Sequence, residues 1–374
     1  MNILVLNSGS SSLKYKLFRG SKVLESGLID RIGLENGDAK NHNEAVKKVL
    51  LHLEIGKINA IGHRVVHGGE KYKDPVKINA KVIKEIKNLC ELAPLHNPPN
   101  LAGILACQKY LPKVSQVAVF DTAFHQTLPE KAFLYGLPYK YYSKLGIRRY
   151  GFHGTSHKYV THEAIKMLKK KNAKVVTVHL GNGSSIAASK GGKSVDTSMG
   201  FTPLEGLIMG TRCGDLDPAI VFYLQEKLKI DTDKIDEILN KESGLKGLSG
   251  ISSDMRKIYA LSKKGNKRAL LMIEILGYRI AKYVGAYTAV LNGLDAIVFT
   301  AGMGEKAFYV RKKACGYLKH LGLKLDNSKN RRNALKIHAS GSKVKVFVIP
   351  TNEELQISRE VREVVKQKGK IVKK

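Results

Sequence analysis

Residues 173–189, AKVVTVHLGNGSSIAAS, are the stretch that most constrains what this chain can fold into. The β-branched run 175–178 enters the turn GNGSS (181–185) and leaves through IAA (186–188), which predicts a strand, a tight turn and a second strand. Two glycines one residue apart allow positive φ angles, and successive backbone N–H groups in such a turn can bind an anion. A plain hairpin has the same pattern, because Asn-Gly between apolar runs is a strong hairpin signal.

The same plan recurs at the start of the chain. Residues 2–17, NILVLNSGSSSLKYKL, combine an apolar strand, a turn of Asn, Ser and Gly, and an outgoing strand with Leu13, Tyr15 and Leu17 on one face. The two copies are too far apart in the sequence to be one hairpin. They therefore predict a duplicated domain with a phosphate loop in each half, and a cleft between the halves that holds the chemistry.

Apolar strand patterns alternate with helical patterns along the chain. The predicted strands are residues 3–6, 61–66, 114–120, 175–178, 296–300 and 344–349. The predicted helices are residues 80–92, 101–110, 156–170, 218–227, 269–291, 306–321 and 354–365. Ser156 is the expected N-cap of its helix, and Pro218 suits a helix start. The alternation predicts an α/β fold with mostly parallel central strands and a hairpin after each phosphate turn.

Polar residues and glycines follow the predicted strands. These strand exits are 7–10 (NSGS), 121–122 (DT), 181–183 (GNG), 302–305 (GMGE) and 352–354 (NEE). Ligands of open α/β sheets bind where strands end, and such residues can hold phosphate, ribose or Mg²⁺. Structural loops can look similar, but five such exits together favour a binding site. Residues 302–307 also fit a dinucleotide fingerprint, yet no βαβ unit follows, so we expect a loop on the adenosine side of a nucleotide.

Composition argues against several classes of protein. The 374 residues carry 64 Lys plus Arg and 32 Asp plus Glu, a net charge of +32, but the lysines form no basic stripe, which argues against nucleic-acid binding. The cysteines, Cys90, Cys107, Cys213 and Cys315, form no CxxC, which favours a reducing compartment. There is no apolar run of about 18 residues, and we expect no signal peptide. We therefore expect a cytoplasmic protein without a nucleic-acid or membrane partner.

Nine motifs, in order along the chain, carry a family resemblance. They are VLNSGSSSLKY, GHRVVHGGE, ELAPLHNPPN, VFDTAFHQT, YGFHGTSHKYV, HLGNGSS, TSMGFTPLEGLIMGTRCGDLDPA, FTAGMGE and IPTNEEL. Together they resemble the motif series of the acetokinase (acetate kinase) family over essentially the whole chain. The resemblance implies an α/β fold of duplicated actin-like ATPase (ribonuclease H-like) domains with a cleft between them. It also implies a homodimer and reversible phosphoryl transfer from ATP to acetate, giving acetyl phosphate and ADP.

The expected domains follow from this resemblance. An N-terminal lobe of residues 1–122 plus 354–374 would form the carboxylate and phosphate side. A C-terminal lobe of residues 123–353 would bind the nucleotide and form the dimer. We expect the lobes to close during the reaction and exclude water from the transfer.

Arg64 and Arg212 are the candidate cations for the transfer. Acetate and the γ-phosphate are both anions, so their in-line approach needs positive charge, and a guanidinium can hold two oxygens at once. By resemblance, Arg64 binds the acetate carboxylate and Arg212 stabilises the equatorial oxygens of the transferring phosphoryl group. His153 is the expected donor at the transition state, and His179 the expected donor beside the phosphate turn. Exposed surface arginines are the alternative, although both arginines lie in turns rich in His and Gly.

Three residues with side-chain oxygens complete the expected catalytic centre. By resemblance, Asn7 and Glu353 bind Mg²⁺, or alternatively Mn²⁺, since Mg²⁺ prefers oxygen ligands and bridges nucleotide phosphates. Asp121 occupies the position of the family's active-site aspartate, often described as a proton donor or acceptor. A carboxylic acid is already ionised at pH 7, because carboxyl pKa values are about 4. We therefore hypothesise that Asp121 orients the substrate or metal-bound water.

Two larger sets of residues complete the expected site. The resemblance assigns ATP contacts to Lys14, His179, Leu180, Gly181, Asn182, Gly183, Asp254, Met255, Arg256, Gly302, Met303, Gly304, Glu305 and Lys306. Lys306 stands where the family commonly has asparagine. The resemblance places the pocket for the acetate methyl group at Val66, Leu95, Phe152 and Pro203, which could otherwise be ordinary core residues. A β-branched Val66 leaves less room than alanine, which favours acetate over longer acids.

Three other functions remain as alternatives. A propionate or butyrate kinase of the same family would share most of the motifs. An actin-like or Hsp70-like ATP-binding module would use the fold to switch a partner, and would need neither the arginine pair nor the methyl pocket. A nicotinamide enzyme is the most distant alternative, and it would form no ADP in response to acetate.

Overall fold

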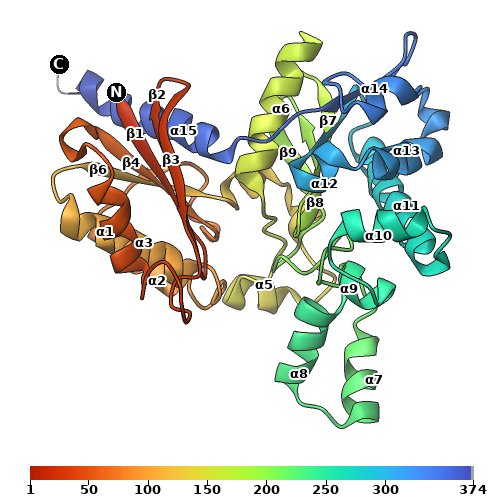
Figure 1. Ribbon diagram of the computed structural model, residues 1–374, viewed down its shortest axis with the longest axis horizontal. Coiled ribbons are helices and arrows are strands. Elements are labelled where there is room, and N and C mark those ends of the chain that lie inside the picture. The colour runs from red at the N-terminus through yellow and green to blue at the C-terminus, as the bar shows by residue number, and fades with distance from the viewer. Residues whose placement is uncertain (372–374) are drawn as a thin grey trace. The chain divides into compact units, whose positions relative to one another are not determined.

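The chain folds into two compact units, which a computed structural model describes over residues 1–371 (Figure 1). The first unit comprises residues 1–126, 154–156 and 352–371, and the second comprises residues 127–153 and 157–351. Among these residues, no helix is both long enough and apolar enough to span a membrane.

The first unit is built on a mixed sheet. Its strands are β1 (Asn2–Ser8), β2 (Leu13–Arg19), β3 (Lys22–Ile29), β4 (Ala60–Val65), β5 (Val76–Lys77) and β6 (Ser115–Phe120). They lie in the order β3-β2-β1-β4-β6-β5. Strands β1, β4 and β6 are parallel, whereas β1, β2 and β3 form an antiparallel meander. The carboxyl ends of β1, β4 and β6 therefore meet at one edge of the sheet.

The sheet of the second unit repeats this plan. Its strands are β7 (Lys174–Leu180), β8 (Ser184–Lys190), β9 (Lys193–Thr197), β10 (Ala296–Thr300) and β11 (Lys345–Val348). Their order β9-β8-β7-β10-β11 corresponds to β3-β2-β1-β4-β6, with the same parallel and antiparallel pairings. The duplication predicted from the two turns is therefore confirmed, and a hairpin follows β1 and β7 as expected.

Helices cover both faces of the first sheet. They are α1 (His42–Leu51), α2 (Ala80–Asn88), α3 (Asn97–Tyr110) and α15 (Glu353–Ile371). One buried cluster joins Leu4 and Leu6 of β1 to α1 and α3. Helix α15 lies on the opposite face, where a Cβ at Gly62 would come within 2.6 Å of the Val361 side chain. Gly62 therefore lets α15 approach the centre of the sheet closely.

The second unit has the same layering around its own sheet. Its helices are α4 (Glu130–Phe133), α5 (Tyr139–Leu145), α6 (Gly154–Leu168), α7 (Ala219–Leu228), α8 (Thr232–Glu237), α9 (Gly244–Ser249), α10 (Met255–Ser262), α11 (Lys267–Val290), α12 (Ala301–Lys306), α13 (Phe308–Tyr317) and α14 (Asn327–Arg331). Helix α6, whose first turn belongs to the first unit, packs through Val160 and Ala164 on one face. The long α11 packs on the other face through Met272, Leu276 and Ile280.

All of the predicted strands and helices are present, but several boundaries were wrong. Helix α6 begins at Gly154, not after a Ser156 cap, because His153 adopts a left-handed φ of 54° and starts the helix earlier. The predicted loop 302–305 forms α12, which follows β10 directly. The predicted helix 306–321 is interrupted at Ala307, whose ψ of 74° is not helical. The other helices that were not predicted are α1, α4, α5, α8, α9, α10 and α14, and the strands that were not predicted are β3, β5 and β9.

Candidate active site

Four residues predicted for catalysis or metal binding meet at the strand-end edge of the first unit. Asn7 lies near the end of β1, Arg64 near the end of β4, Asp121 directly after β6, and Glu353 at the start of α15. The Arg64 guanidinium donates from Nη2 to Asp121 Oδ2 and from Nη1 to Asn7 Oδ1, at 3.3 Å for the second bond. Its Nε lies 3.9 Å from Glu353 Oε2. A single guanidinium thus contacts all three oxygen-bearing groups.

The electrostatics of this cluster leave it able to bind a further ligand. Burial alone would lower the pKa of Arg64, but the charges of Asp121 and Glu353 raise it, so the guanidinium stays charged. Burial raises the pKa of Glu353 to about 7, and the negative charge of Asp121 adds to this although Arg64 opposes it. The Nε of Arg64 is buried and makes no hydrogen bond among the described residues. A carboxylate bound here would therefore have an unused donor, Arg64 Nε, from which to accept a hydrogen bond.

Thr155 is a functional candidate that the sequence reasoning missed. Its hydroxyl lies 3.0 Å from Asp121 Oδ1, so each oxygen of the carboxylate accepts a hydrogen bond, one from Thr155 and one from Arg64. The neighbouring Gly154 makes this approach possible, because a Cβ there would lie 1.9 Å from the Asp121 carbonyl oxygen. The sequence signal is the Gly-Thr pair that follows Phe152-His153.

Asn97 and Asn100 hold the segment that follows Arg64, and they were also missed. Asn100 Oδ1 accepts from the Val66 amide at 3.0 Å, and Asn97 Oδ1 accepts from the His67 amide at 3.0 Å. Asn100 Nδ2 also donates to the Ser8 carbonyl at 2.6 Å. Both asparagines are buried at the start of α3, so they fix the exits of β1 and β4 relative to each other. Two asparagines three residues apart, at the start of a helix with Pro98-Pro99 between them, are the signal that could have identified them.

In the second unit, a chain of hydrogen bonds supports His153. Ser185 Oγ lies 2.8 Å from His153 Nδ1 and 2.8 Å from His157 Nε2. His157 Nδ1 in turn lies 2.7 Å from Thr177 Oγ1. The His179 ring stacks on His153 with centroids 4.1 Å apart. The predicted pair of histidines therefore lies together, in an orientation that β7 and β8 fix through Thr177 and Ser185.

The turn between β7 and β8 uses its glycines differently from the prediction. Neither Gly181 nor Gly183 has a positive φ, so that expectation was wrong. The turn instead closes through a hydrogen bond from the Gly181 amide to the Gly183 carbonyl at 3.0 Å. A Cβ at Gly183 would lie 3.3 Å from His153 Nε2 and 3.4 Å from Arg212 Nη1. A side chain at position 183 would therefore crowd His153 and Arg212, and glycine lets these two side chains lie close to the turn.

Arg212 lies in an irregular segment that a separate polar network anchors. Its Nη1 donates to the Pro203 carbonyl at 3.2 Å, and burial lowers its pKa. The Arg149 guanidinium donates to Glu205 and to the carbonyls of residues 197, 198 and 199 at 3.1, 3.1 and 3.3 Å. Tyr135 donates to Glu205 Oε2 at 2.5 Å. This network, which sequence reasoning missed, fixes the backbone on either side of Pro203.

The predicted methyl-pocket residues are divided between the units. Val66 and Leu95 belong to the first unit, and Phe152 and Pro203 to the second. Val66 and Phe152 are buried, whereas Leu95 is 68 % exposed. The first unit by itself therefore does not bury Leu95 within a pocket.

The predicted nucleotide contacts also fall in both units. Lys14 lies in the first unit, where its ammonium pairs with Glu354 at 2.6 Å. The remaining residues of this set are in the second unit. There Asp254 caps α10 and pairs with Arg256 at 2.7 Å. Residues 302–306 lie in α12, with Lys306 exposed. In the second unit the phosphate turn follows β7 and α12 follows β10. Because these two strands are parallel neighbours, the turn and α12 lie at the same edge of the sheet.

Two oxygen-bearing side chains of the first unit would be the ligands of a divalent cation. Asn7 Oδ1 and the Glu353 carboxylate are hard oxygen donors, and the buried Glu353 would be favoured in its ionised form by a nearby cation. The described residues contain no group of three His, Cys, Asp or Glu side chains suited to a metal. Asn7 and Glu353 are the residues of this cluster that would hold a divalent cation such as Mg²⁺, which typically binds one or two protein oxygens together with nucleotide phosphates.

The repeated sheets, with polar turns at equivalent strand ends, define the duplicated actin-like ATPase fold. Residues 2–359 match the model of the acetokinase family. The acetate kinase of Halothermothrix orenii is 52 % identical over 396 residues, covering 98 % of this chain and 100 % of that protein. The chain belongs to the acetokinase family, which confirms the resemblance seen in its motifs.

Solved structures agree with this assignment. The acetate kinase of Porphyromonas gingivalis superposes with a TM-score of 0.92 at 43 % identity, and covers 97 % of this chain and 99 % of its own. A propionate kinase from Francisella tularensis subsp. tularensis SCHU S4 also gives a TM-score of 0.92, at 45 % identity and the same coverage. The predicted fold class is therefore confirmed.

Proposed function

We propose that this chain is an acetate kinase, which transfers the γ-phosphoryl group of ATP to acetate and forms acetyl phosphate and ADP reversibly. The observation that carries the proposal is the mostly buried guanidinium of Arg64, which is held by Asp121 and Asn7 and keeps an unused Nε donor. Relatives about half identical over nearly the whole chain are acetate kinases. The enzyme is accordingly a phosphotransferase with a carboxyl group as acceptor.

Arg64 binds the acetate carboxylate in this proposal. Its charge is maintained by Asp121 and Glu353, so it can neutralise the approach of a second anion. The methyl group then lies against Val66, Leu95, Phe152 and Pro203. Val66 is the best supported of these, because Asn100 fixes its backbone two residues after Arg64. Its branched side chain sets the length of the acid that fits.

Arg212, His153 and His179 stabilise the phosphoryl group during direct in-line transfer. Gly183 brings the phosphate turn next to His153 and Arg212, which supports a shared role at one phosphate. Arginine remains protonated even when burial lowers its pKa, so Arg212 keeps its charge. Arginines with this role contribute about 10³–10⁵ in rate, or roughly 4–7 kcal/mol.

In this mechanism Asp121 orients Arg64, and through it the substrate, and it transfers no proton. Both of its oxygens already accept hydrogen bonds, from Arg64 and Thr155, and acetate needs no deprotonation at neutral pH. Asn7 and Glu353 would hold Mg²⁺, with Mn²⁺ as a substitute. The ion supplies positive charge that neutralises the nucleotide phosphates during transfer.

The nucleotide is held mainly by the second unit. We assign the phosphates to His179, Leu180, Gly181, Asn182 and Gly183, and the adenosine side to Asp254, Met255, Arg256, Gly302, Met303, Gly304, Glu305 and Lys306. Lys14 adds a cation from the first unit. The division into a carboxylate lobe and a nucleotide lobe, with boundaries near residues 122 and 353, is part of this proposal.

A homodimer in the cytoplasm is the expected state. Among the described residues of α7 none is buried, although the helix carries Ile220, Phe222, Tyr223 and Leu228. An exposed apolar helix of this kind is typical of an interface between protein chains. The four cysteines are free thiols, which suits a reducing compartment.

A hydroxamate-trap assay tests the proposal directly. The enzyme would be incubated with ATP, Mg²⁺, hydroxylamine and acetate, propionate or butyrate, and acyl hydroxamate would be measured. We expect the highest kcat/KM with acetate. A higher value with propionate would favour the activity named for the Francisella tularensis relative, and no hydroxamate with any acid would favour an ATP-binding module.

A further inference from the structure

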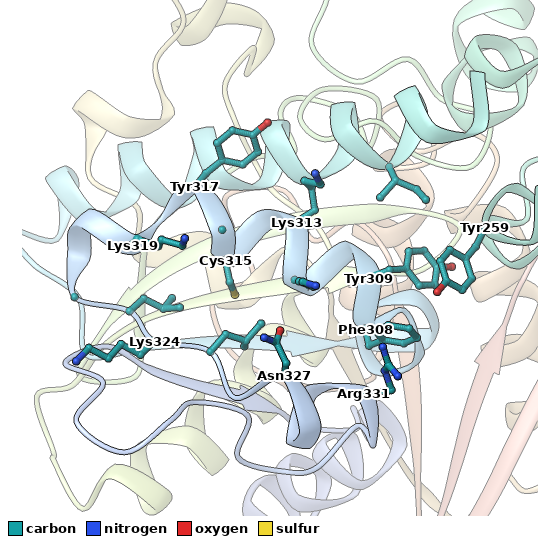
Figure 2. A pocket seen from close by; sticks show the side chains of 16 residues that line it. Tyr259, Phe308, Tyr309, Lys313, Cys315, Tyr317, Lys319, Lys324, Asn327 and Arg331 are labelled. Atoms are coloured by element: carbon teal, nitrogen blue, oxygen red, sulfur yellow. The ribbon is translucent and has the colours of Figure 1, made fainter. Parts of the chain in front are cut away.

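A large cavity in the second unit lies outside the proposed active site. It has a volume of about 1080 Å³ and is lined by residues of α10, α11, α13 and α14 and of the segment 319–327 (Figure 2). Pockets for small ligands typically have volumes of about 300–1,000 Å³. The cavity is thus large enough for an organic molecule and not only for water or a single inorganic ion.

The lining of this cavity is strongly cationic. It includes Lys312, Lys313, Lys319, Lys324 and Arg331, and it includes no aspartate or glutamate. Lys313 pairs with Glu274, but none of Lys312, Lys319 and Lys324 has a carboxylate within ion-pair distance among the described residues. Concave surfaces lined by one sign of charge concentrate ions of the opposite sign. An anion that enters the cavity would therefore be attracted by these lysines.

One end of the cavity is a rigid aromatic wall. Tyr259 and Tyr309 stack with centroids 3.6 Å apart and planes 4° apart, and Phe308 meets both rings edge-on. Figure 2 shows this pair at one end of the view, with Lys319 and Lys324 at the other. A planar ring can pack against such a wall.

The inner surface of the cavity is apolar. Ile273 and Leu323 are buried there, together with Cys315, whose thiol pKa is raised to about 12 by burial and which stays neutral. Leu325 extends the same surface. The cavity therefore combines an apolar floor, an aromatic end and a cationic end.

None of the residues proposed to contact ATP lines this cavity. The two regions are neighbours, because the Tyr309 hydroxyl donates to the Met255 carbonyl at 3.2 Å and Met255 belongs to the proposed adenosine side. Tyr309 therefore forms part of the wall between the cavity and the nucleotide segment. A ligand of the cavity need not compete with ATP.

We propose that this cavity is a second ligand site, which binds a small phosphate monoester carried on a planar ring. The ring packs at the end formed by Tyr259 and Tyr309, and the phosphate lies among Lys312, Lys319 and Lys324. The inference does not depend on the proposed kinase activity.

Pyridoxal 5′-phosphate is a suitable probe, because it has both features and its aldehyde forms an imine with a lysine amine. Borohydride reduction followed by peptide mapping identifies the modified lysines. We expect at least one of Lys312, Lys319 and Lys324 to be labelled about tenfold or more faster than Lys264 and Lys282, which are also exposed but lie outside the cavity lining. Saturating ATP should leave this labelling unchanged. Equal labelling rates, or protection by ATP, would overturn the proposal.

Equilibrium binding of pyridoxine 5′-phosphate, which lacks the aldehyde, provides a second measurement. The triple variant Lys312→Gln/Lys319→Gln/Lys324→Gln should raise the Kd about tenfold or more. The matched control Lys190→Gln/Lys264→Gln/Lys282→Gln removes the same charge from positions of the same unit that are also exposed but do not line the cavity, and it should leave the Kd unchanged. If both triple variants raised the Kd equally, the ligand would be responding to the net charge of the protein, and the proposed ligand site in the cavity would be contradicted. Unchanged kcat in both triples verifies their folding.

Discussion

Arg64 donates a hydrogen bond to Asp121 at the ends of two parallel strands, and Asp121 receives its second hydrogen bond from Thr155. The aspartate side chain is almost completely buried and the arginine is mostly buried. A buried carboxylate with a donor on each oxygen is suited to hold its neighbours in place. The proposed mechanism depends on this orientation of Arg64.

Asp121→Asn tests whether this carboxylate orients or transfers protons. The substitution keeps the size of the side chain but removes the charge that holds Arg64. We expect kcat to fall by at least about 10²-fold, equivalent to roughly 3 kcal/mol, at every pH tested. A pH–rate profile that only shifts, with full activity recovered at higher pH, would instead establish proton transfer.

Thr155→Val removes the second donor to Asp121 without changing the volume of the side chain. A hydrogen bond to a charged group contributes about 1.5–3 kcal/mol, so kcat/KM for acetate should fall by about 10–100-fold. Thr161→Val is the matched control on α6, because the Thr161 hydroxyl is buried without a hydrogen-bond partner. Steady-state kinetics of both variants would decide. If Thr161→Val lowered kcat/KM as much as Thr155→Val, the loss would come from disturbing α6 and not from the hydrogen bond to Asp121.

Ser185→Ala removes the hydroxyl between His153 and His157. His153 then loses the partner of Nδ1, so we expect kcat to fall about tenfold through misorientation of the ring. Ser185→Thr keeps a hydroxyl and should restore most of the activity. Ser189→Ala is the control on the same strand, where the hydroxyl bonds only to the Val175 carbonyl, and it should retain full activity. If Ser189→Ala lost as much activity as Ser185→Ala, the proposed support of His153 would be wrong.

Val66→Ala tests the position of the methyl pocket. Removing two methyl groups makes room for a longer acid, and one methylene in such a pocket discriminates by about 1–3 kcal/mol. The ratio of kcat/KM for propionate to that for acetate should rise by about fivefold or more. Val65→Ala, a buried neighbour in β4, should not change that ratio. An unchanged ratio in Val66→Ala would mean that the pocket lies elsewhere.

His63 makes the stability of the first unit depend on pH. Burial lowers the pKa of His63 from 6.5 to about 4 in the folded state, so the unfolded chain takes up the proton first as the pH falls. The free energy of unfolding is therefore highest above about pH 6.5. It decreases as the pH falls from 6.5 towards 4, and at pH 5 it is lower by about 2 kcal/mol.

Urea unfolding at pH 7.5 and pH 5 measures this effect. The wild type should lose about 2 kcal/mol more unfolding free energy than His63→Gln between these two values. His52→Gln, at an exposed position of the same unit, should behave like the wild type. A His63→Gln variant with the same pH dependence as the wild type would contradict the assignment.

The sequence allowed the fold to be predicted where local patterns repeat. The β-branched runs before the two turns predicted β1 and β7, and their similarity predicted the duplication. Asn7 and Asp121 were predicted as strand exits that could bind a ligand, whereas Arg64 was assigned only by the family resemblance. Helix α12 was missed because its glycines indicate a loop, whereas it packs directly after β10.

The supporting residues could not be predicted, because their roles depend on contacts between distant segments. Thr155 reaches Asp121 only after residues 154–156, the first turn of α6, are placed at the end of β6, and Asn100 reaches Val66 and Ser8 only after α3 packs on the sheet. The reason for Gly183 was also misjudged. The φ angle of Gly183 is not positive, so the backbone conformation does not require glycine. The reason for the glycine is the closeness of the His153 and Arg212 side chains.

The central claim is that a carboxylic acid accepts the phosphoryl group. Its most direct test is ADP formation by the purified enzyme with ATP and Mg²⁺, measured with and without acetate while acetyl phosphate is quantified. We predict that ADP forms only when acetate is present, with one acetyl phosphate for each ADP. ADP formation at the same rate without acetate, and with no acetyl phosphate, would contradict the account.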